Sequence, residues 1–419
     1  MSNLPRLVHV RQNFPRPAPL DVRATLAAEF AKLRPRLKPG ARIAVGVGSR
    51  GITQLKTIVA EVLALLRGAG VEPFIFPAMG SHGGATPEGQ REILASYDLT
   101  EESMRTPIRA SLEVRQVGVT VDGKPVWCSV EALAADGIVL INRVKPHTDF
   151  SGEIGSGLLK MAVVGLGKRA GAASMHLAAS ELGHERAIRT MAVVLIRETP
   201  LLGGFSILEN QFHETARIVV LRREEMEKGE DALLVEARRL MPLLPFDEID
   251  LLIVDRIGKN ISGTGLDPNV IMRSIDGYSS HLRRDGRPSP FIRRIFVRDL
   301  TPETHGNAIG IGLADITTTR LARAMDARVS FTNCLTALTP QSGKLPVYFD
   351  TDRECIERAL ATVPLADTTA AKIVRIADTL AVAEMEISEN LWAEIRARPE
   401  MAALDEPHAV EFDADGNLR

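Results

Sequence analysis

The chain has 419 residues, of which 45% are hydrophobic and 25% are charged, and its formal net charge is −2. This composition is typical of a globular protein with two or three domains, and the balanced charge excludes a strong attraction to nucleic acid or membrane surfaces. Three scattered cysteines exclude a disulfide framework, and no apolar run suits a signal peptide or a membrane span, so we expect a soluble, cytoplasmic protein.

Strand-like and helix-like segments alternate in the first half of the chain. The expected strands are the apolar runs Arg42–Val47, Val71–Phe76 and Gly137–Asn142. The expected helices cover Leu55–Leu66, the segment from Thr86-Pro87 to Tyr97, and Met175–Leu195. Such alternation predicts an α/β fold with mainly parallel sheets.

A break in the chain is indicated at 241–246, where two prolines separate a charged helix from a new strand. We expect an N-terminal α/β domain over residues 1–245 and a second α/β domain over 246–400, with an active-site cleft between them. The tail at 401–419 is expected to be polar and loose. The expected strands of the second domain are Ile249–Val254, Ile295–Val297, Val329–Thr332 and Thr379–Ile387.

Reactive residues follow three of the expected strands. Arg50 lies in Gly48-Ser49-Arg50-Gly51, His82 in Gly80-Ser81-His82-Gly83-Gly84, and His147 at the end of Arg143-Val144-Lys145-Pro146-His147. A single histidine at a strand end is more often a surface or capping residue. If the strands are parallel, however, all three side chains open onto the crevice where α/β sheets bind ligands.

A glycine-rich segment beside these loops contains Lys160. The lysine follows Ser156-Gly157, Gly165 comes five residues later, and His176 stands sixteen residues beyond the lysine. Glycines let the backbone approach a ligand closely, and a desolvated lysine amine is a nucleophile. The pattern therefore suits an anionic or covalently held cofactor, and His176 could reach a metal in the same site.

Two histidines and an arginine together favour one kind of reaction. His82 and His147 can each act as acid or base near neutral pH, so they could remove and return a proton on opposite faces of one carbon. Arg50 could clamp a substrate carboxylate with two hydrogen bonds. We therefore expect stereochemical inversion next to a carboxylate.

These motifs resemble those of the lactate racemase family, which uses a nickel-pincer nucleotide to racemise or epimerise 2-hydroxy acids. The similarity rests on Gly80-Ser81-His82 followed by Thr86 and Glu88, on His147 followed by Ser156-Gly157-x-x-Lys160, and on Lys160-x4-Gly165-x10-His176. It extends loosely over most of the chain.

The resemblance implies a role for each candidate residue. Lys160 would hold the pyridinium-3-thioamide-5-thiocarboxylic acid mononucleotide through a thioamide, in a binding loop with Ser156, Gly157 and Gly165. His176 would be the protein ligand to nickel. His82 and His147 would exchange protons while the α-hydride moves to the cofactor and back, and Arg50 would bind the carboxylate of the substrate. Dedicated maturation proteins would have to supply the cofactor.

The chain departs from the family pattern in two places that concern the substrate. No bulky basic residue follows the histidine in His82-Gly83-Gly84, which leaves room for a substrate larger than lactate. In the second domain, family members usually place a glutamine and a lysine near the substrate carboxylate, and the stretch 255–265 of this chain does not match that pattern. Lys259 is the only lysine between Asp250 and Leu300, so it is our candidate for this carboxylate contact. Lys168 is a rival cofactor anchor, but its spacing to His176 differs from that of the family.

Other functions have weaker signals. Gly46-Val47-Gly48-Ser49-Arg50-Gly51 matches the dinucleotide fingerprint, so an NAD-dependent hydroxyacid dehydrogenase is the alternative, although no acidic residue ends the next strand. A group of arginines could indicate nucleic-acid binding, namely Arg283, Arg284, Arg287, Arg293, Arg294 and Arg298. Aromatic residues, however, make up only 4% of the chain and are not interleaved there. His184 is expected to be solvated. The sequence does not fix the oligomeric state.

Overall fold

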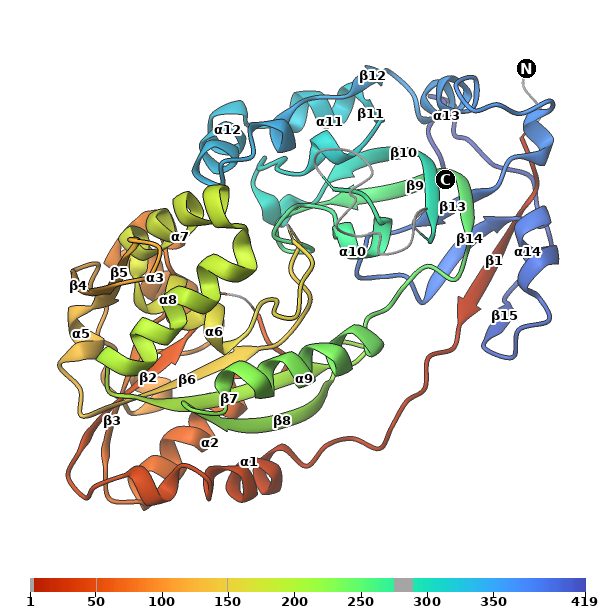
Figure 1. Ribbon diagram of the computed structural model, residues 1–419. Helices are drawn as coiled ribbons and strands as arrows, with labels where there is room; N and C mark the ends of the chain where they lie inside the picture. Colours follow the sequence, from red (N-terminus) through yellow and green to blue (C-terminus); the bar gives the residue numbers. More distant parts are fainter. Residues whose placement is uncertain (1–3, 50, 149, 275–288) are drawn as a thin grey trace. The chain divides into compact units, whose positions relative to one another are not determined.

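The chain divides into two compact units in the computed structural model, which describes residues 4–49, 51–148, 150–274 and 289–419. The first unit is Pro17–Met241, and the second combines Met1–Arg16 with Pro242–Arg419. Both contain a mainly parallel sheet with helices, which confirms the predicted α/β fold (Figure 1). Within the described part of the chain, every helix is too short or too polar to cross a bilayer.

The first unit is built on a five-stranded sheet with the order β3-β2-β6-β7-β8. Its strands are β2 (Arg42–Val47), β3 (Glu72–Pro77), β6 (Gly137–Arg143), β7 (Leu201–Glu209) and β8 (Thr215–Arg222). The first four strands of this order are parallel, and β8 pairs antiparallel with β7. The carboxyl ends of β2, β3 and β6 therefore lie at one edge of the sheet.

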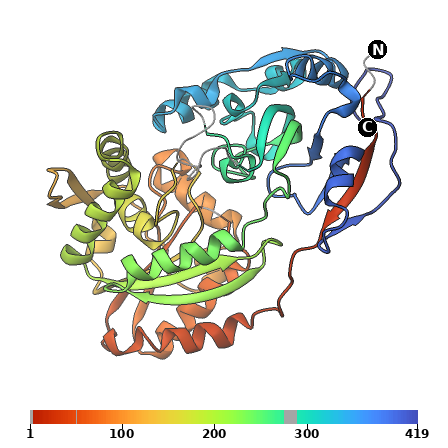
Figure 2. The same cartoon turned by 45° about the vertical axis from the view of Figure 1, so that its right-hand side comes forward.

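Helices cover both faces of this sheet (Figure 2). One face packs against α1 (Val22–Phe30), α2 (Leu55–Gly68), α3 (Pro87–Ser96) and α4 (Glu101–Met104). The other packs against α5 (Val130–Leu133), α6 (Leu158–Lys160), α7 (Lys168–Leu182), α8 (His184–Glu198) and α9 (Met226–Arg239). A hairpin of β4 (Val114–Val119) and β5 (Pro125–Ser129) packs against α7 and α8.

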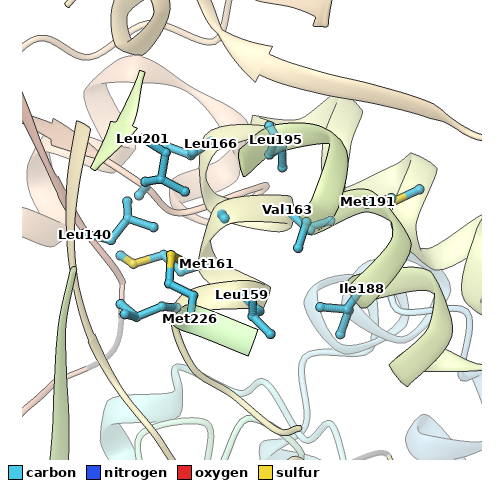
Figure 3. Packing of buried hydrophobic residues seen from close by; sticks show 14 of the residues in the cluster. Leu140, Leu159, Met161, Val163, Leu166, Ile188, Met191, Leu195, Leu201 and Met226 are labelled. Carbon is cyan, nitrogen blue, oxygen red and sulfur yellow. The ribbon is translucent and has the colours of Figure 1, made fainter. Parts of the chain in front are cut away.

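The core on the second of these faces supports the glycine-rich segment. Leu159 and Met161, which flank Lys160, are buried and belong to the same cluster as Leu140 of β6 and Ile188 of α8 (Figure 3). Met161–Leu166 forms a π-helical turn directly after Lys160. Such turns are rare and often occur at functional sites. The apolar neighbours of Lys160 thus fix the backbone from which its side chain projects.

The second unit contains an eight-stranded sheet with the order β12-β11-β10-β9-β13-β14-β1-β15. Its strands are β1 (Leu7–Gln12), β9 (Glu248–Ile257), β10 (Phe291–Leu300), β11 (Ile316–Thr318), β12 (Val347–Phe349), β13 (Ile373–Ile376), β14 (Glu384–Ser388) and β15 (Met401–Ala403). Its helices are α10 (Pro268–Ile271), α11 (Thr319–Ala324), α12 (Ala327–Thr336), α13 (Asp352–Leu360) and α14 (Glu389–Ile395). Strands β9 to β13 pair in parallel, whereas β14, β1 and β15 pair antiparallel.

The two ends of the chain differ from the expected domain limits. β1 pairs with β14 and β15, so the first sixteen residues join the second unit and not the domain expected over 1–245. The tail expected to be loose over 401–419 is packed: β15 pairs with β1, Leu418 is only 8% exposed, and its N–H donates to Asp352.

Two expected elements are also wrong. Val329–Thr332 lies within the helix α12, because Asp326 caps that helix by accepting from the N–H of Val329. Met175–Leu195 is not one helix, because Gly183 has a positive φ of 80° and separates α7 from α8.

Candidate active site

His82 follows β3 and reaches the loop that follows the neighbouring strand β2. Its Nδ1 contacts the hydroxyl of Ser49, which stands just beyond the end of β2. The hydroxyl of Tyr97 donates to the carbonyl of Ser49 at 3.0 Å, which also anchors the backbone of this loop. Parallel pairing of β2 and β3 thus brings a histidine and a serine together at the predicted edge.

The loop of His82 can be formed only with glycine at two positions. Gly80 has φ +59°, and a Cβ there would lie 2.8 Å from Val164. Gly83 has φ +66°, and a Cβ there would lie 2.5 Å from the backbone of Gly89. Thr86 then caps α3 by accepting from the N–H of Gly89 at 3.0 Å. These close approaches hold the His82 loop against Val164 and against the start of α3.

His147 lies at the end of the loop after β6 and is in contact with Lys160. The Lys160 amine meets the Nε2 of His147. His147 is buried, with 8% of its surface exposed, whereas Lys160 is partly buried. The backbones of Lys145 and Ser156 exchange two hydrogen bonds, of 2.9 and 2.8 Å, which hold the two loops together. The structure therefore joins a predicted acid/base residue to the predicted cofactor anchor.

Two polar side chains fix the turn before Lys160. The amide of Asn142, at the end of β6, donates to the carbonyl of Gly157 at 2.7 Å. Glu230 of α9 is fully buried, and its carboxylate accepts from the N–H of Leu159 at 3.0 Å. A Cβ on Gly157 would lie 2.3 Å from that carboxylate, so only glycine fits there. Gly165 is similarly confined, since its Cβ would lie 2.8 Å from the carbonyl oxygen of Ala78.

The charges around His147 are basic. Burial lowers the pKa of His147 well below its ordinary value of 6.5, and the charges of Lys160, His184, Lys145 and His176 lower it further. A histidine in this environment is neutral at pH 7 and has a nitrogen lone pair available. The same basic charges favour an anionic ligand at this place.

His176 and His184 are the two further histidines of this region. His176 lies on α7 and is close enough to His147 to influence its pKa. His184 is not simply solvated as expected: its ring stacks on Phe150 at a centroid distance of 5.0 Å, and Phe150 stacks on His147 at 4.4 Å. The break at Gly183 allows this placement, because it starts α8 at His184.

The metal chemistry of this region is limited by its ligands. Over the residues that the structure describes, no three His, Cys, Asp or Glu side chains gather as a metal site. His176 can offer an imidazole nitrogen to a metal.

The remaining candidates for binding a carboxylate are Arg50 and Lys259. Arg50 lies outside the described residues. Lys259 belongs to the second unit, where its amine donates to the side-chain carbonyl of Asn333, and Asn307 donates to the same oxygen at 3.2 Å.

Several residues of the candidate site were not predicted from the sequence. They are Ser49, Asn142, Phe150 and Glu230, and to these we add His184, whose place was wrongly expected. The first two stand at strand ends that were already identified, so a polar residue there was a usable signal. Phe150 and Glu230 gave no such signal, since their roles depend on tertiary packing.

The family model described as lactate racemase N-terminal domain matches residues 22–187. Among solved structures, the chain is similar to the lactate racemase apoprotein from Thermoanaerobacterium thermosaccharolyticum, at 13% identity and a TM-score of 0.48, over 90% of this chain and 99% of that chain. No curated protein matches the chain. The family match contains β2, β3, β6, the Lys160 segment and α7.

Proposed function

We propose that this protein is a racemase or epimerase acting on C2 of a 2-hydroxy acid, because residues 22–187 match the family model of the lactate racemase N-terminal domain, in agreement with the resemblance seen in the sequence. The observation that carries the proposal is the contact between Lys160 and His147, at the edge where His82 also lies. In this contact a partly buried lysine amine meets a buried imidazole whose pKa is lowered, and both lie within the matched segment.

Lys160 is proposed to hold a nickel-pincer nucleotide, with Ser156, Gly157 and Gly165 forming the loop around it. The amine is partly buried and the side chains around it are basic, which suits an anionic nucleotide. His176 would be the protein ligand to nickel, and the pincer would supply the other donors. When bound, this group would supply the hydride acceptor that inversion of a carbinol carbon requires.

The histidines are proposed to move protons. His147, neutral because its pKa is lowered, would accept the proton of the substrate hydroxyl. His82 would serve the opposite face, with Ser49 orienting its ring through Nδ1. Arg50 is proposed to bind the carboxylate of the substrate, and Lys259 a further carboxylate or hydroxyl oxygen. Gly84, whose missing side chain leaves open space, favours a substrate larger than lactate.

A dehydrogenase that binds NAD through the glycines after β2 is less well supported. Gly46, the first glycine of the fingerprint, lies inside β2, and a Cβ there would lie 2.7 Å from Leu140. Its presence is thus explained by packing. The following helix, α2, begins only at Leu55, whereas the fingerprint places a helix directly after the glycines.

Racemisation of a panel of 2-hydroxy acids, followed by chiral chromatography, tests the proposed function. The protein would be produced together with the cofactor maturation proteins that this chemistry needs. We expect both enantiomers to appear from one, without consumption of added NAD. Oxidation of the hydroxy acid that depends on NAD would instead support the dehydrogenase.

A further inference from the structure

We infer that Gln90 and Lys168 form a buried positioning pair that holds the His82 loop against the helix that carries His176. The inference rests on the proposed function for the roles of these two histidines. The pair itself is a structural feature that can be tested without cofactor or substrate.

Lys168 is the first residue of α7, and its side chain is completely buried. Its amine donates to the carbonyl of Pro77 at the end of β3 and to the side-chain oxygen of Gln90 at 3.0 Å. It also lies 5.1 Å from the centre of the Phe76 ring. The start of α7 is thereby tied to the end of the strand that leads to His82.

Gln90 lies on α3 and is also completely buried. Its side-chain nitrogen donates to the carbonyl of Gly80 at 3.1 Å and to that of His82 at 3.4 Å. One amide group therefore accepts from the lysine with its oxygen and supports the histidine loop with its nitrogen. A buried side chain with both ends occupied has one favoured orientation.

The burial of Lys168 also indicates which of the two lysines, Lys160 or Lys168, could carry a cofactor. Burial lowers the pKa of Lys168 to about 8, which is the expected cost of removing an ammonium from water. With no exposed surface, this amine offers no access to a nucleotide, whereas Lys160 is partly exposed. Lys168 thus serves the site by holding backbone, through Gln90 and Pro77, and not by carrying a cofactor.

The variant Gln90→Glu separates the two functions of the glutamine. A glutamate has the same shape and can still accept from Lys168, so the fold is expected to persist. It loses the N–H groups that support Gly80 and His82. We expect amide hydrogen exchange at residues 80–86 to accelerate about tenfold or more in the apoprotein, because two supporting hydrogen bonds are gone. Exchange in β6 should not change.

A matched control is Gln116→Glu, which makes the same chemical change at an exposed position of β4. It should leave exchange at 80–86 as in the wild type. Lys168→Met is a second variant, which removes the donor to Gln90 and Pro77; it too should accelerate exchange at 80–86. Wild-type exchange of this loop in folded Gln90→Glu or Lys168→Met protein would overturn the inference.

Measurements on enzyme that carries the proposed cofactor distinguish a positioning role of Gln90 from a purely structural one. Gln90→Glu should keep the mass adduct on Lys160 and the substrate KM while kcat falls, since only the placement of His82 is disturbed. An unchanged kcat in the loaded variant would contradict the positioning role. Absence of adduct and turnover in the wild type would instead contradict the proposed function, and would leave the exchange result standing.

Discussion

The amine of Lys160 touches the Nε2 of His147, although the two residues stand thirteen positions apart in the chain. An ammonium can only donate, so the Nε2 it meets presents its lone pair. The charge of Lys160 also lowers the pKa of His147, so the proposed anchor influences the protonation of the proposed base. A change in the lysine, by mutation or by acylation, should be detected at the histidine.

The first prediction concerns the protonation of His147 in Lys160→Gln. Burial is the largest cause that lowers the pKa of His147, and the charge of Lys160 is the second. Removing that charge should raise the pKa of His147 in the apoprotein, though not fully to its ordinary value. NMR titration of the histidine ring measures this. Lys56→Gln, which removes an exposed lysine paired with Asp98, is the control and should leave the pKa unchanged.

The second prediction concerns turnover. His82→Gln and His147→Gln should each lower kcat by about 10²- to 10⁴-fold, the usual contribution of a general acid or base. Both variants should keep the mass adduct on Lys160. His9→Gln is the control, since His9 lies on β1 in the second unit. Wild-type turnover in either active-site variant would exclude that histidine from proton transfer.

The third prediction concerns the turn before Lys160. Gly157→Ala would place a methyl group 2.3 Å from the buried carboxylate of Glu230, so we expect a loss of about 1–3 kcal/mol in the free energy of unfolding. Gly68→Ala is the matched control: it ends α2 with open space around it, and should be neutral or slightly stabilising. Urea unfolding of both variants measures the difference. Equal stability would show that the turn can move away from Glu230.

The fourth prediction concerns pH. Burial raises the pKa of Glu230 to about 7 from 4.5, so its stabilising contribution is complete below pH 4.5 and is lost as the pH rises through 7. Relative to Glu230→Gln, the wild type should therefore lose about 3 kcal/mol of stability between pH 4.5 and pH 8. Urea unfolding across this range measures it. A difference between the two proteins that does not vary with pH would mean that Glu230 is ionised throughout.

The strands that position the site could be predicted from the sequence because each is a short, continuous apolar run. Arg42–Val47 is an example, since burial on both faces of a parallel sheet demands that composition. Parallel pairing then brings the ends of β2, β3 and β6 to one edge. The strands alone were therefore enough to predict that His82 and His147 lie at that edge.

The errors arose where distant contacts decide the local structure. Val329–Thr332 has the β-branched and aromatic residues of a strand, but Asp326 caps a helix there. β1 joins the second unit because it pairs with β14, where Arg11 meets Glu384 at a separation of 373 positions. Glu230 could not be recognised, because its meeting with Gly157 depends on how α9 packs.

Intact mass and peptide mapping test the central claim most directly. The protein would be produced with the cofactor maturation pathway, and its Lys160→Ala variant would be prepared in parallel. We predict a nucleotide-sized mass increase in the wild type that maps to the peptide containing Lys160 and is absent from the variant. No mass increase, or one that persists in Lys160→Ala or maps to Lys168, would contradict the account.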